Sequence, residues 1–168
     1  METIRIAGVV KQSVVDGPGL RFVVFTQGCP HRCPGCHNPD THDFDGGYDC
    51  EVEKILREID RNPLLSGLTV SGGEPFRRAA ELLPLCRAVR GRGMNVICYT
   101  GYLFEDLLEQ SQIDADIASL LALTDTLVDG KYIQQLRDLT LRFRGSSNQR
   151  VIDIPASMET GRAMEAGF

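Results

Sequence analysis

Short apolar runs rich in β-branched residues alternate along this chain with amphipathic stretches, and this alternation limits the folds that it can adopt. Side chains repeat every two residues in a strand and about every 3.6 residues in a helix, so the two kinds of segment predict strands and helices. The predicted strands are Ile4–Val10, Arg21–Thr26, Gly67–Ser71, Met94–Thr100 and Thr126–Asp129. The predicted helices are Glu51–Asp60, Pro75–Arg90, Leu103–Glu109 and Ile113–Leu121. Strands and helices in this order predict an α/β fold with a mostly parallel sheet.

The length of the chain limits how far such a sheet can close. The chain has 168 residues, whereas a closed barrel of eight strand–helix units typically needs ~250. We therefore expect either a partial, laterally open (β/α) barrel or an open sheet, in one domain over residues 1–154. Residues 155–168 are small, polar and aperiodic, which predicts a poorly ordered C-terminal tail. Pro84 is expected to kink or split its helix.

Charge and hydropathy exclude two broad classes of protein. Lys plus Arg is 18 and Asp plus Glu is 23, which gives a net charge of −5. This balance disfavours a general binder of nucleic acid, because such binding rests on clustered positive charge. No apolar run approaches the ~20 residues that span a bilayer, and Glu2 stands where a secretory signal needs basic residues. We expect a cytoplasmic protein with no membrane partner.

Three cysteines in one loop carry the strongest chemical signal. The segment Gly28–Asn38 has the sequence G-C-P-H-R-C-P-G-C-H-N, which spaces Cys29, Cys33 and Cys36 as C-x3-C-x2-C. Pro30 and Pro34 prevent a helix there, so the three thiolates can converge on one centre. An electron-carrying 4Fe-4S cluster normally takes four cysteines. Three ligands leave one iron open, and an open position is typical of a catalytic metal site.

The loop also has a zinc interpretation. His31 or His37 would complete a Cys3His zinc knuckle, whereas ligand softness and spacing favour iron–sulfur. A disulfide or a thioredoxin-like pair is the weakest alternative. The remaining cysteines lack mutual metal spacing and are expected to pack in the core as small hydrophobic residues; they are Cys50, Cys86 and Cys98.

Other candidate residues follow the ends of predicted strands, where α/β folds place their sites. The strand beginning at Leu68 ends in Gly72-Gly73-Glu74-Pro75, which is either an ordinary connector or a place where a ligand approaches the backbone. Thr100 to Tyr102 follow the next strand, as a turn or as part of a site. Asp129 and Lys131 follow the strand after that, as a solvated pair or as site residues.

C-x3-C-x2-C followed by G-G-E-P resembles the signature of the radical S-adenosylmethionine (SAM) superfamily. The resemblance implies a 4Fe-4S cluster held by Cys29, Cys33 and Cys36, with an open iron that chelates the amino and carboxylate groups of SAM. One electron then cleaves SAM to methionine and a 5′-deoxyadenosyl radical. The cofactor-binding residues implied in this way are Gly35, Cys36, His37, Gly72, Gly73, Glu74, Asp129 and Lys131. Gly35 stands where the superfamily often has an aromatic residue.

Four segments narrow the resemblance to the glycyl-radical activating enzymes, and the last two look like the branch that acts on anaerobic ribonucleoside-triphosphate reductases. They are Val15–Cys29, Cys33–Pro39, Leu127–Tyr132 and Leu141–Arg150, and the last contains R-G-S-S-N-Q. The similarity covers roughly residues 4–153, with His37 where that branch commonly has Tyr. It implies removal of hydrogen from a glycine in the C-terminal loop of the large reductase subunit, with flavodoxin or ferredoxin as electron donor.

Three functional alternatives remain open from sequence. They are a different glycyl-radical activase, a deazaguanine-type synthase of the same superfamily, and a zinc-binding interaction domain. The late polar segment is also open: it is either a solvated loop and edge strand or a contact surface for an anionic group or a partner protein. Its donor-rich residues are Arg142, Arg144, Ser146, Ser147, Asn148 and Arg150.

Overall fold

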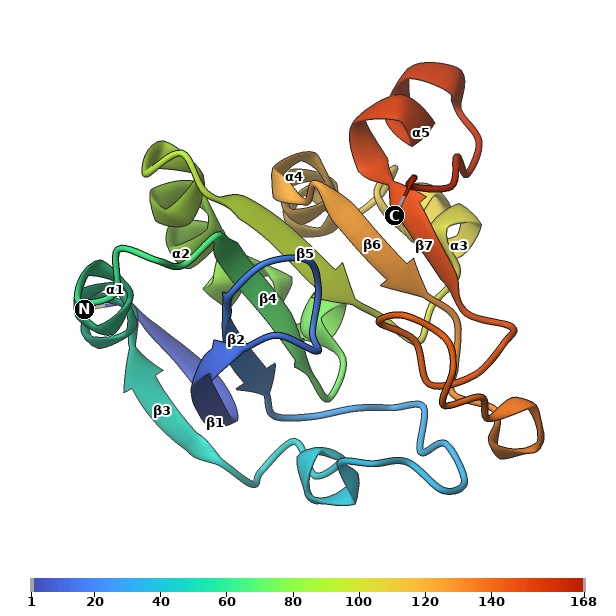
Figure 1. Cartoon of the computed structure of the whole chain (residues 1–168), viewed down its shortest axis with the longest axis horizontal. Coiled ribbons are helices and arrows are strands. Elements are labelled where there is room, and N and C mark those ends of the chain that lie inside the picture. Colours follow the sequence, from blue (N-terminus) through green and yellow to red (C-terminus); the bar gives the residue numbers. More distant parts are fainter. Residues whose placement is uncertain (1, 168) are drawn as a thin grey trace.

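The computed structural model describes residues 2–167, which form one seven-stranded sheet with the order β3-β1-β2-β4-β5-β6-β7 (Figure 1). The strands are β1 (Thr3–Ser13), β2 (Arg21–Thr26), β3 (Tyr48–Glu51), β4 (Gly67–Gly72), β5 (Asn95–Tyr99), β6 (Thr126–Asp129) and β7 (Arg150–Asp153). The neighbouring strands β2, β4, β5 and β6 run parallel, whereas β1, β3 and β7 are antiparallel to their neighbours. The α/β class is confirmed, with a mixed sheet in place of the mostly parallel one expected.

The sheet is open, because β3 and β7 lie at its two edges. Neither strand was among the predicted strands, although an edge strand was one interpretation of the segment that contains β7. Each has only four residues, which is too short for a clear periodic signal. β3 also carries Asp49 and Glu51, and charged residues are common on exposed edges because they discourage pairing with other chains.

Four helices cover one face of the sheet, and Figure 1 shows α2 and α4 behind it. The helices are α1 (Val52–Asp60), α2 (Ala79–Gly91), α3 (Phe104–Gln110), α4 (Ala115–Leu123) and, after the last strand, α5 (Ile154–Thr160). α2 continues through Pro84, so the split expected there is wrong. The predicted helix Pro75–Arg90 instead divides at Arg78, where a 3-10 helix (Pro75–Arg78) gives way to α2.

The core lies between these helices and alternate residues of the strands. Val24, Val70 and Cys98 are fully buried in this core, so their strand neighbours Phe25 and Ser71 face the opposite side of the sheet. Cys50 and Cys86 are buried in the same core as Cys98. The prediction that these three cysteines pack in the core is therefore confirmed. No helix within residues 2–167 is both long and apolar enough to cross a bilayer.

A buried arginine fixes the loop between β1 and β2 against the face of the sheet that the helices do not cover. Arg21 is fully buried, and its guanidinium donates to Thr69 Oγ1 at 2.7 Å, Leu68 O at 2.8 Å and Pro18 O at 3.2 Å. Burial lowers the pKa of Arg21 to about 10, so the side chain is charged at neutral pH. The loop therefore lies in front of β4, as Figure 1 shows.

The segment after residue 154, which was expected to be poorly ordered, contains a regular helix. α5 begins with Asp153 accepting from Ala156 N, and ends at Gly161 in the left-handed conformation. Residues beyond α5 then pair with β7, since Ala166 N donates to Val151 O. The helix has only seven residues and contains proline, so its periodicity was not visible. The extent of the main domain, residues 1–154, stays a prediction; Met1 and Phe168 lie outside the described residues.

Candidate functional site

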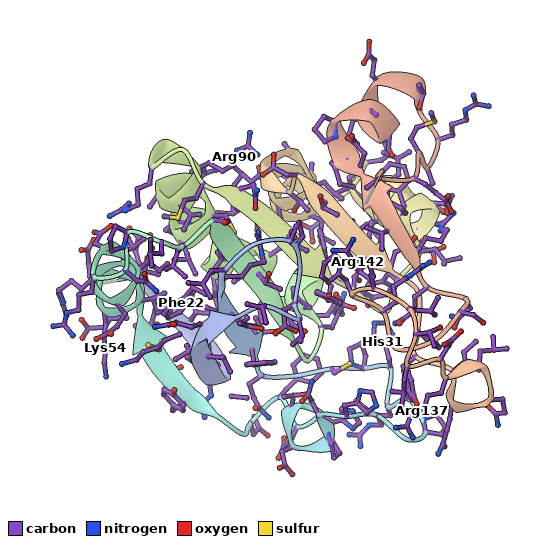
Figure 2. All side chains as sticks on the ribbon, viewed as in Figure 1. Phe22, His31, Lys54, Arg90, Arg137 and Arg142 are labelled. Carbon is purple, nitrogen blue, oxygen red and sulfur yellow. The ribbon has the colours of Figure 1, made fainter. Side chains whose placement is uncertain are left out.

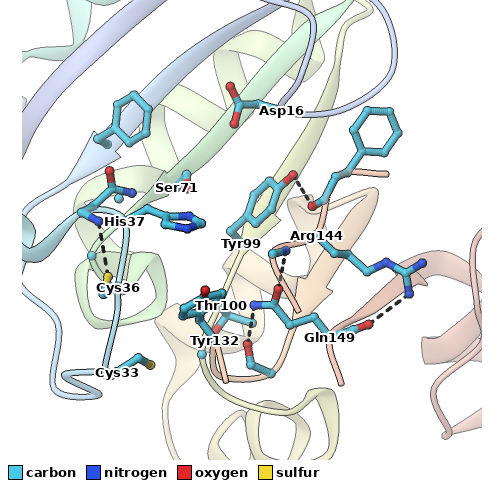
Figure 3. A pocket seen from close by; sticks show the side chains of 18 of the residues that line it. Asp16, Cys33, Cys36, His37, Ser71, Tyr99, Thr100, Tyr132, Arg144 and Gln149 are labelled. Carbon is cyan, nitrogen blue, oxygen red and sulfur yellow. Dashed lines mark hydrogen bonds between the residues drawn. The ribbon is translucent and has the colours of Figure 1, made fainter. Parts of the chain in front are cut away.

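A cavity of about 730 Å³ opens at the carboxyl ends of β2, β4 and β5, on the face opposite the helices (Figure 3). Its walls come from the cysteine loop, from the ends of the three strands and from the segment between β6 and β7. The residues that matter most for its chemistry are Cys29, Cys33, Cys36, Gly72, Gly73 and Tyr99. The parallel strands therefore bring together the cysteine motif and the Gly72-Gly73 motif, which are separated by more than thirty residues in the sequence.

All three loop cysteines line this cavity as free thiols. Hydrogen bonds fix the base of the loop, since Gly28 N donates to Thr41 O at 2.7 Å and Cys29 N donates to His42 O at 3.1 Å. Cys29 is buried, whereas Cys33 and Cys36 are half-buried. Burial raises the pKa of the Cys29 and Cys33 thiols, so metal binding must displace their protons.

The donor set fits a thiolate-bound cluster better than a zinc knuckle. Within residues 2–167, no three metal-ligating side chains surround a common metal position, yet the three thiols share one cavity, as cluster ligands must. His31 Nε2 lies 2.7 Å from Glu74 Oε1, and His37 is exposed and lies against the Tyr132 ring. His31 therefore bonds to a carboxylate and His37 packs on an aromatic ring, whereas the three thiols face the shared cavity.

Glu74 is fully buried and does not line the cavity, although the resemblance implied a cofactor contact. Its carboxylate accepts hydrogen bonds from His31, Thr100 and the backbone of Gly101 and Phe76. The side chain that follows the two glycines is therefore directed into the protein.

Gly72 and Gly73 line the cavity, but the structure gives their missing side chains a second reason. A Cβ on Gly72 would lie 2.5 Å from Thr26 N, and the residue has a φ of +98°. A Cβ on Gly73 would lie 2.4 Å from Gly28 O. Gly72 therefore lets β4 approach the backbone of β2, and Gly73 lets the chain after β4 approach the backbone of the cysteine loop.

Replacing Gly73 by alanine is expected to destabilise the fold by about 3 kcal/mol, because backbone atoms of the cysteine loop must move away. Urea unfolding measures this change. Gly91→Ala is the matched control, since a Cβ there meets nothing within 4 Å and an alanine in a helix stabilises by about 0.5–1 kcal/mol. A Gly73→Ala variant as stable as the wild type contradicts the close approach seen here.

The remaining predicted residues lie around the cavity rather than in it. Asp129 is fully buried; it accepts from Phe104 N at 2.7 Å and from Arg150 Nε at 3.0 Å. Lys131 lines a neighbouring hollow of about 450 Å³ together with His31 and Glu109. Gly35 has a φ of +74°, and its Cα packs against the Gln134 side chain.

Residues 144–150 form an internal clasp, and a role of this segment as a contact surface stays a prediction. Gln149 Oε1 accepts from Gly145 N at 2.8 Å and Ser146 N at 3.2 Å, and its Nε2 donates to Gly130 O at 3.0 Å. Asn148 Nδ2 donates to Lys131 O at 2.8 Å. These bonds attach the segment to the end of β6 and so build one wall of the cavity (Figure 3).

Comparison with known proteins identifies the family. Residues 15–152 match the family described as "4Fe-4S single cluster domain". The anaerobic ribonucleoside-triphosphate reductase-activating protein of Escherichia coli K12 is 34% identical over 146 residues, which cover 82% of this chain and 91% of that protein. The chain belongs to the family of anaerobic ribonucleoside-triphosphate reductase-activating proteins. The activating proteins of Vibrio cholerae (38% identity, 81% of this chain, 89% of that protein) and of phage T4 (34%, 82%, 86%) are similar over nearly the same extent.

A solved structure has a fold similar to that of this activating protein. QueE from Escherichia coli superposes with a TM-score of 0.51 at 20% identity, over 59% of this chain and 52% of QueE. The chain thus spans about half the length of that neighbour, and the likeness shows a shared fold. The family expected from the four similar segments is confirmed by the sequence relatives.

Tyr99 lines the cavity and was not among the residues predicted from the sequence. Its hydroxyl donates to Phe143 O at 2.7 Å, which attaches the segment between β6 and β7 to the sheet (Figure 3). Burial raises the pKa of Tyr99, so the hydroxyl keeps its proton and remains a donor. The signal was available, because Tyr99 alternates with Cys98 along β5 and must face the side opposite the core.

Replacing Gln149 by methionine is expected to lower the free energy of unfolding by about 2 kcal/mol, since two backbone donors and one carbonyl lose their partner. Denaturant unfolding measures the loss, and the exposed Ser147→Ala variant serves as control with a change within about 0.5 kcal/mol. Equal stability of the two variants means that the segment is a solvated surface and not a clasp.

Proposed function

We propose that this protein is a radical SAM activase, which generates a glycyl radical on the anaerobic (class III) ribonucleoside-triphosphate reductase. The observation that carries the proposal is the set of three free cysteines on one cavity, in a chain that belongs to the activating-protein family. When bound, a 4Fe-4S cluster supplies one electron that cleaves the carbon–sulfur bond of SAM, giving methionine and a 5′-deoxyadenosyl radical that takes hydrogen from the glycine α-carbon.

The residues of the chain divide this task. Cys29, Cys33 and Cys36 would hold the cluster and would leave one of its irons for SAM. The backbone of Gly72 and Gly73 faces the cavity, where carbonyl groups accept hydrogen bonds from the methionine amino group. His37, at the cavity wall, contributes to the SAM site. Gly35, Glu74, Asp129 and Lys131 support this site from outside the cavity lining.

The open sheet is consistent with a protein as the substrate. We propose that the sheet acts as a partial, laterally open barrel, and that the C-terminal glycine loop of the large reductase subunit enters from the open side. Flavodoxin or ferredoxin is the proposed electron donor, and the proposed compartment is the cytoplasm. Neither nucleic acid nor membrane is a proposed partner.

The test combines the reduced protein, SAM and the reductase under anaerobic conditions. The expected result is a glycyl doublet in the electron paramagnetic resonance (EPR) spectrum, together with one methionine and one 5′-deoxyadenosine per activation event. Omitting SAM or the reductase is the control and should remove the doublet. SAM cleavage without a doublet on this reductase assigns the protein to another radical enzyme class, whereas a colourless zinc protein overturns the proposal.

A further inference from the structure

A carboxylate inside the protein joins the cysteine loop to the ends of two strands. Glu74 Oε1 accepts from His31 Nε2 at 2.7 Å and from Gly101 N at 2.8 Å. Glu74 Oε2 accepts from Phe76 N at 3.1 Å, and Thr100 Oγ1 lies 2.9 Å from both oxygens. Both carboxylate oxygens therefore have partners within the protein.

His31 forms the loop end of this connection. It lies in the sequence midway between Cys29 and Cys33, and its side chain is only 6% exposed. The ring packs edge-on against Tyr102, with centroids 4.6 Å apart and an interplanar angle of 76°. Figure 2 shows His31 at the same end of the molecule as Arg137 and Arg142, away from Lys54 on α1.

A glycine makes room for the imidazole. A Cβ on Gly101 would lie 2.4 Å from His31 Cδ2 and 2.7 Å from Nε2. The glycine that follows β5 thus lets the ring of His31 lie directly on the backbone while that backbone donates to Glu74. Hydrogen bonding, ring packing and close approach all act on the same imidazole.

The loop depends on such an anchor because two of its residues, Pro30 and Pro34, have no backbone N–H to donate. Its base is held by the amides of Gly28 and Cys29. The part that carries Cys33 lies beyond that base, and His31 attaches it to the strand ends.

We propose that His31 and Glu74 form a clamp that holds the cysteine loop in the position from which the three thiolates act together. Glu74 is a positioning residue, and the backbone of the two preceding glycines faces the cavity in its place. The clamp is a property of the protein itself; its effect on a bound cluster rests on the proposed function.

The first test uses the metal-free protein and amide hydrogen exchange of residues 28–38, read by mass spectrometry. His31→Leu removes the donor and is expected to accelerate exchange at least about tenfold, because a hydrogen bond to a charged acceptor is worth about one decade or more in an equilibrium. His31→Gln carries an amide N–H close to the position of Nε2 and should restore slow exchange. Glu109→Gln removes an exposed carboxylate beside the same hollow and is the matched control.

Gly101→Ala supplies an independent variant, since it displaces the ring of His31 without replacing either clamp residue. It should accelerate exchange in the same residues as His31→Leu, with a circular dichroism spectrum like that of the wild type. Wild-type exchange in both His31→Leu and Gly101→Ala overturns the clamp, as does equal acceleration in His31→Gln and His31→Leu.

The second test follows the reconstituted protein by EPR of the reduced cluster with and without SAM. His31→Leu should lose the SAM-dependent change in the spectrum, whereas His31→Gln and Glu109→Gln should keep it. An unchanged SAM response in His31→Leu overturns the positioning role. If the wild type binds no cluster, the proposed function fails, and hydrogen exchange in the metal-free protein still decides whether the clamp exists.

Discussion

Replacing Cys29, Cys33 or Cys36 by serine is expected to abolish the brown colour, the bound iron and all cleavage of SAM. Each of the three thiols lines the cavity, and a cluster that loses one of three thiolates lacks the ligands to hold it. Iron analysis after anaerobic reconstitution should fall from about four atoms per chain to near zero. The effect on activity should be a loss of several orders of magnitude, since no step proceeds without the electron.

Cys50→Ser is the matched control for these variants. Cys50 lies in the core on β3, away from the cavity lining, and its thiol is 3.8 Å from a backbone carbonyl of Glu51 that a hydroxyl also satisfies. This variant should keep its iron. If a single loop-cysteine variant retains wild-type iron content while Cys50→Ser loses it, the cluster has been assigned to the wrong residues.

Replacing Arg150 by methionine is expected to lower the free energy of unfolding by about 3 kcal/mol, because Asp129 stays buried without its charged partner. For a chain of this length that corresponds to a decrease of about 6–12 °C in Tm. Hydrogen bonds to Asp129 raise the pKa of Arg150, which is consistent with a strong pair. Differential scanning calorimetry of the metal-free protein measures the change.

Glu105→Gln separates this effect from a surface ion pair. Glu105 also accepts from Arg150, at 2.6 Å, but its side chain is 53% exposed, so the variant should lose less than about 1 kcal/mol. A direct SAM contact by Asp129 predicts the opposite pattern for Asp129→Asn, namely weak SAM binding with an unchanged Tm. That result would show that the ion pair has no structural role.

Local spacing was sufficient for the cysteine loop and for the alternation of strands and helices. The three cysteines lie within eight positions, so their proximity follows from chain geometry. The buried strands and amphipathic helices carry periodic signals of their own. The short strands β3 and β7 and the helix α5 have no such signal, because each is defined by the neighbour that it pairs with or packs against.

The roles of Glu74 and Asp129 required the tertiary structure. Both follow strands and looked alike as cofactor contacts, yet each is buried with partners from distant parts of the chain. His31 lies 43 positions from Glu74, and Arg150 lies 21 positions from Asp129. Strand order decides which of these distant residues lies beside each carboxylate. The closeness of the surrounding backbone decides where a side chain has room.

By itself, the sequence determined the α/β class and the closeness of the three loop cysteines, since these rest on residue types at short, regular spacings, and its resemblance to known enzymes indicated the family. Only the tertiary structure decided that the glycines after β4 admit neighbouring backbone, that Glu74 is directed into the protein, and that Gln149 holds the cavity wall. The physical reason is that burial and hydrogen-bond pairing are properties of the assembled strand ends, where residues remote in sequence compete for the same donors and the same space.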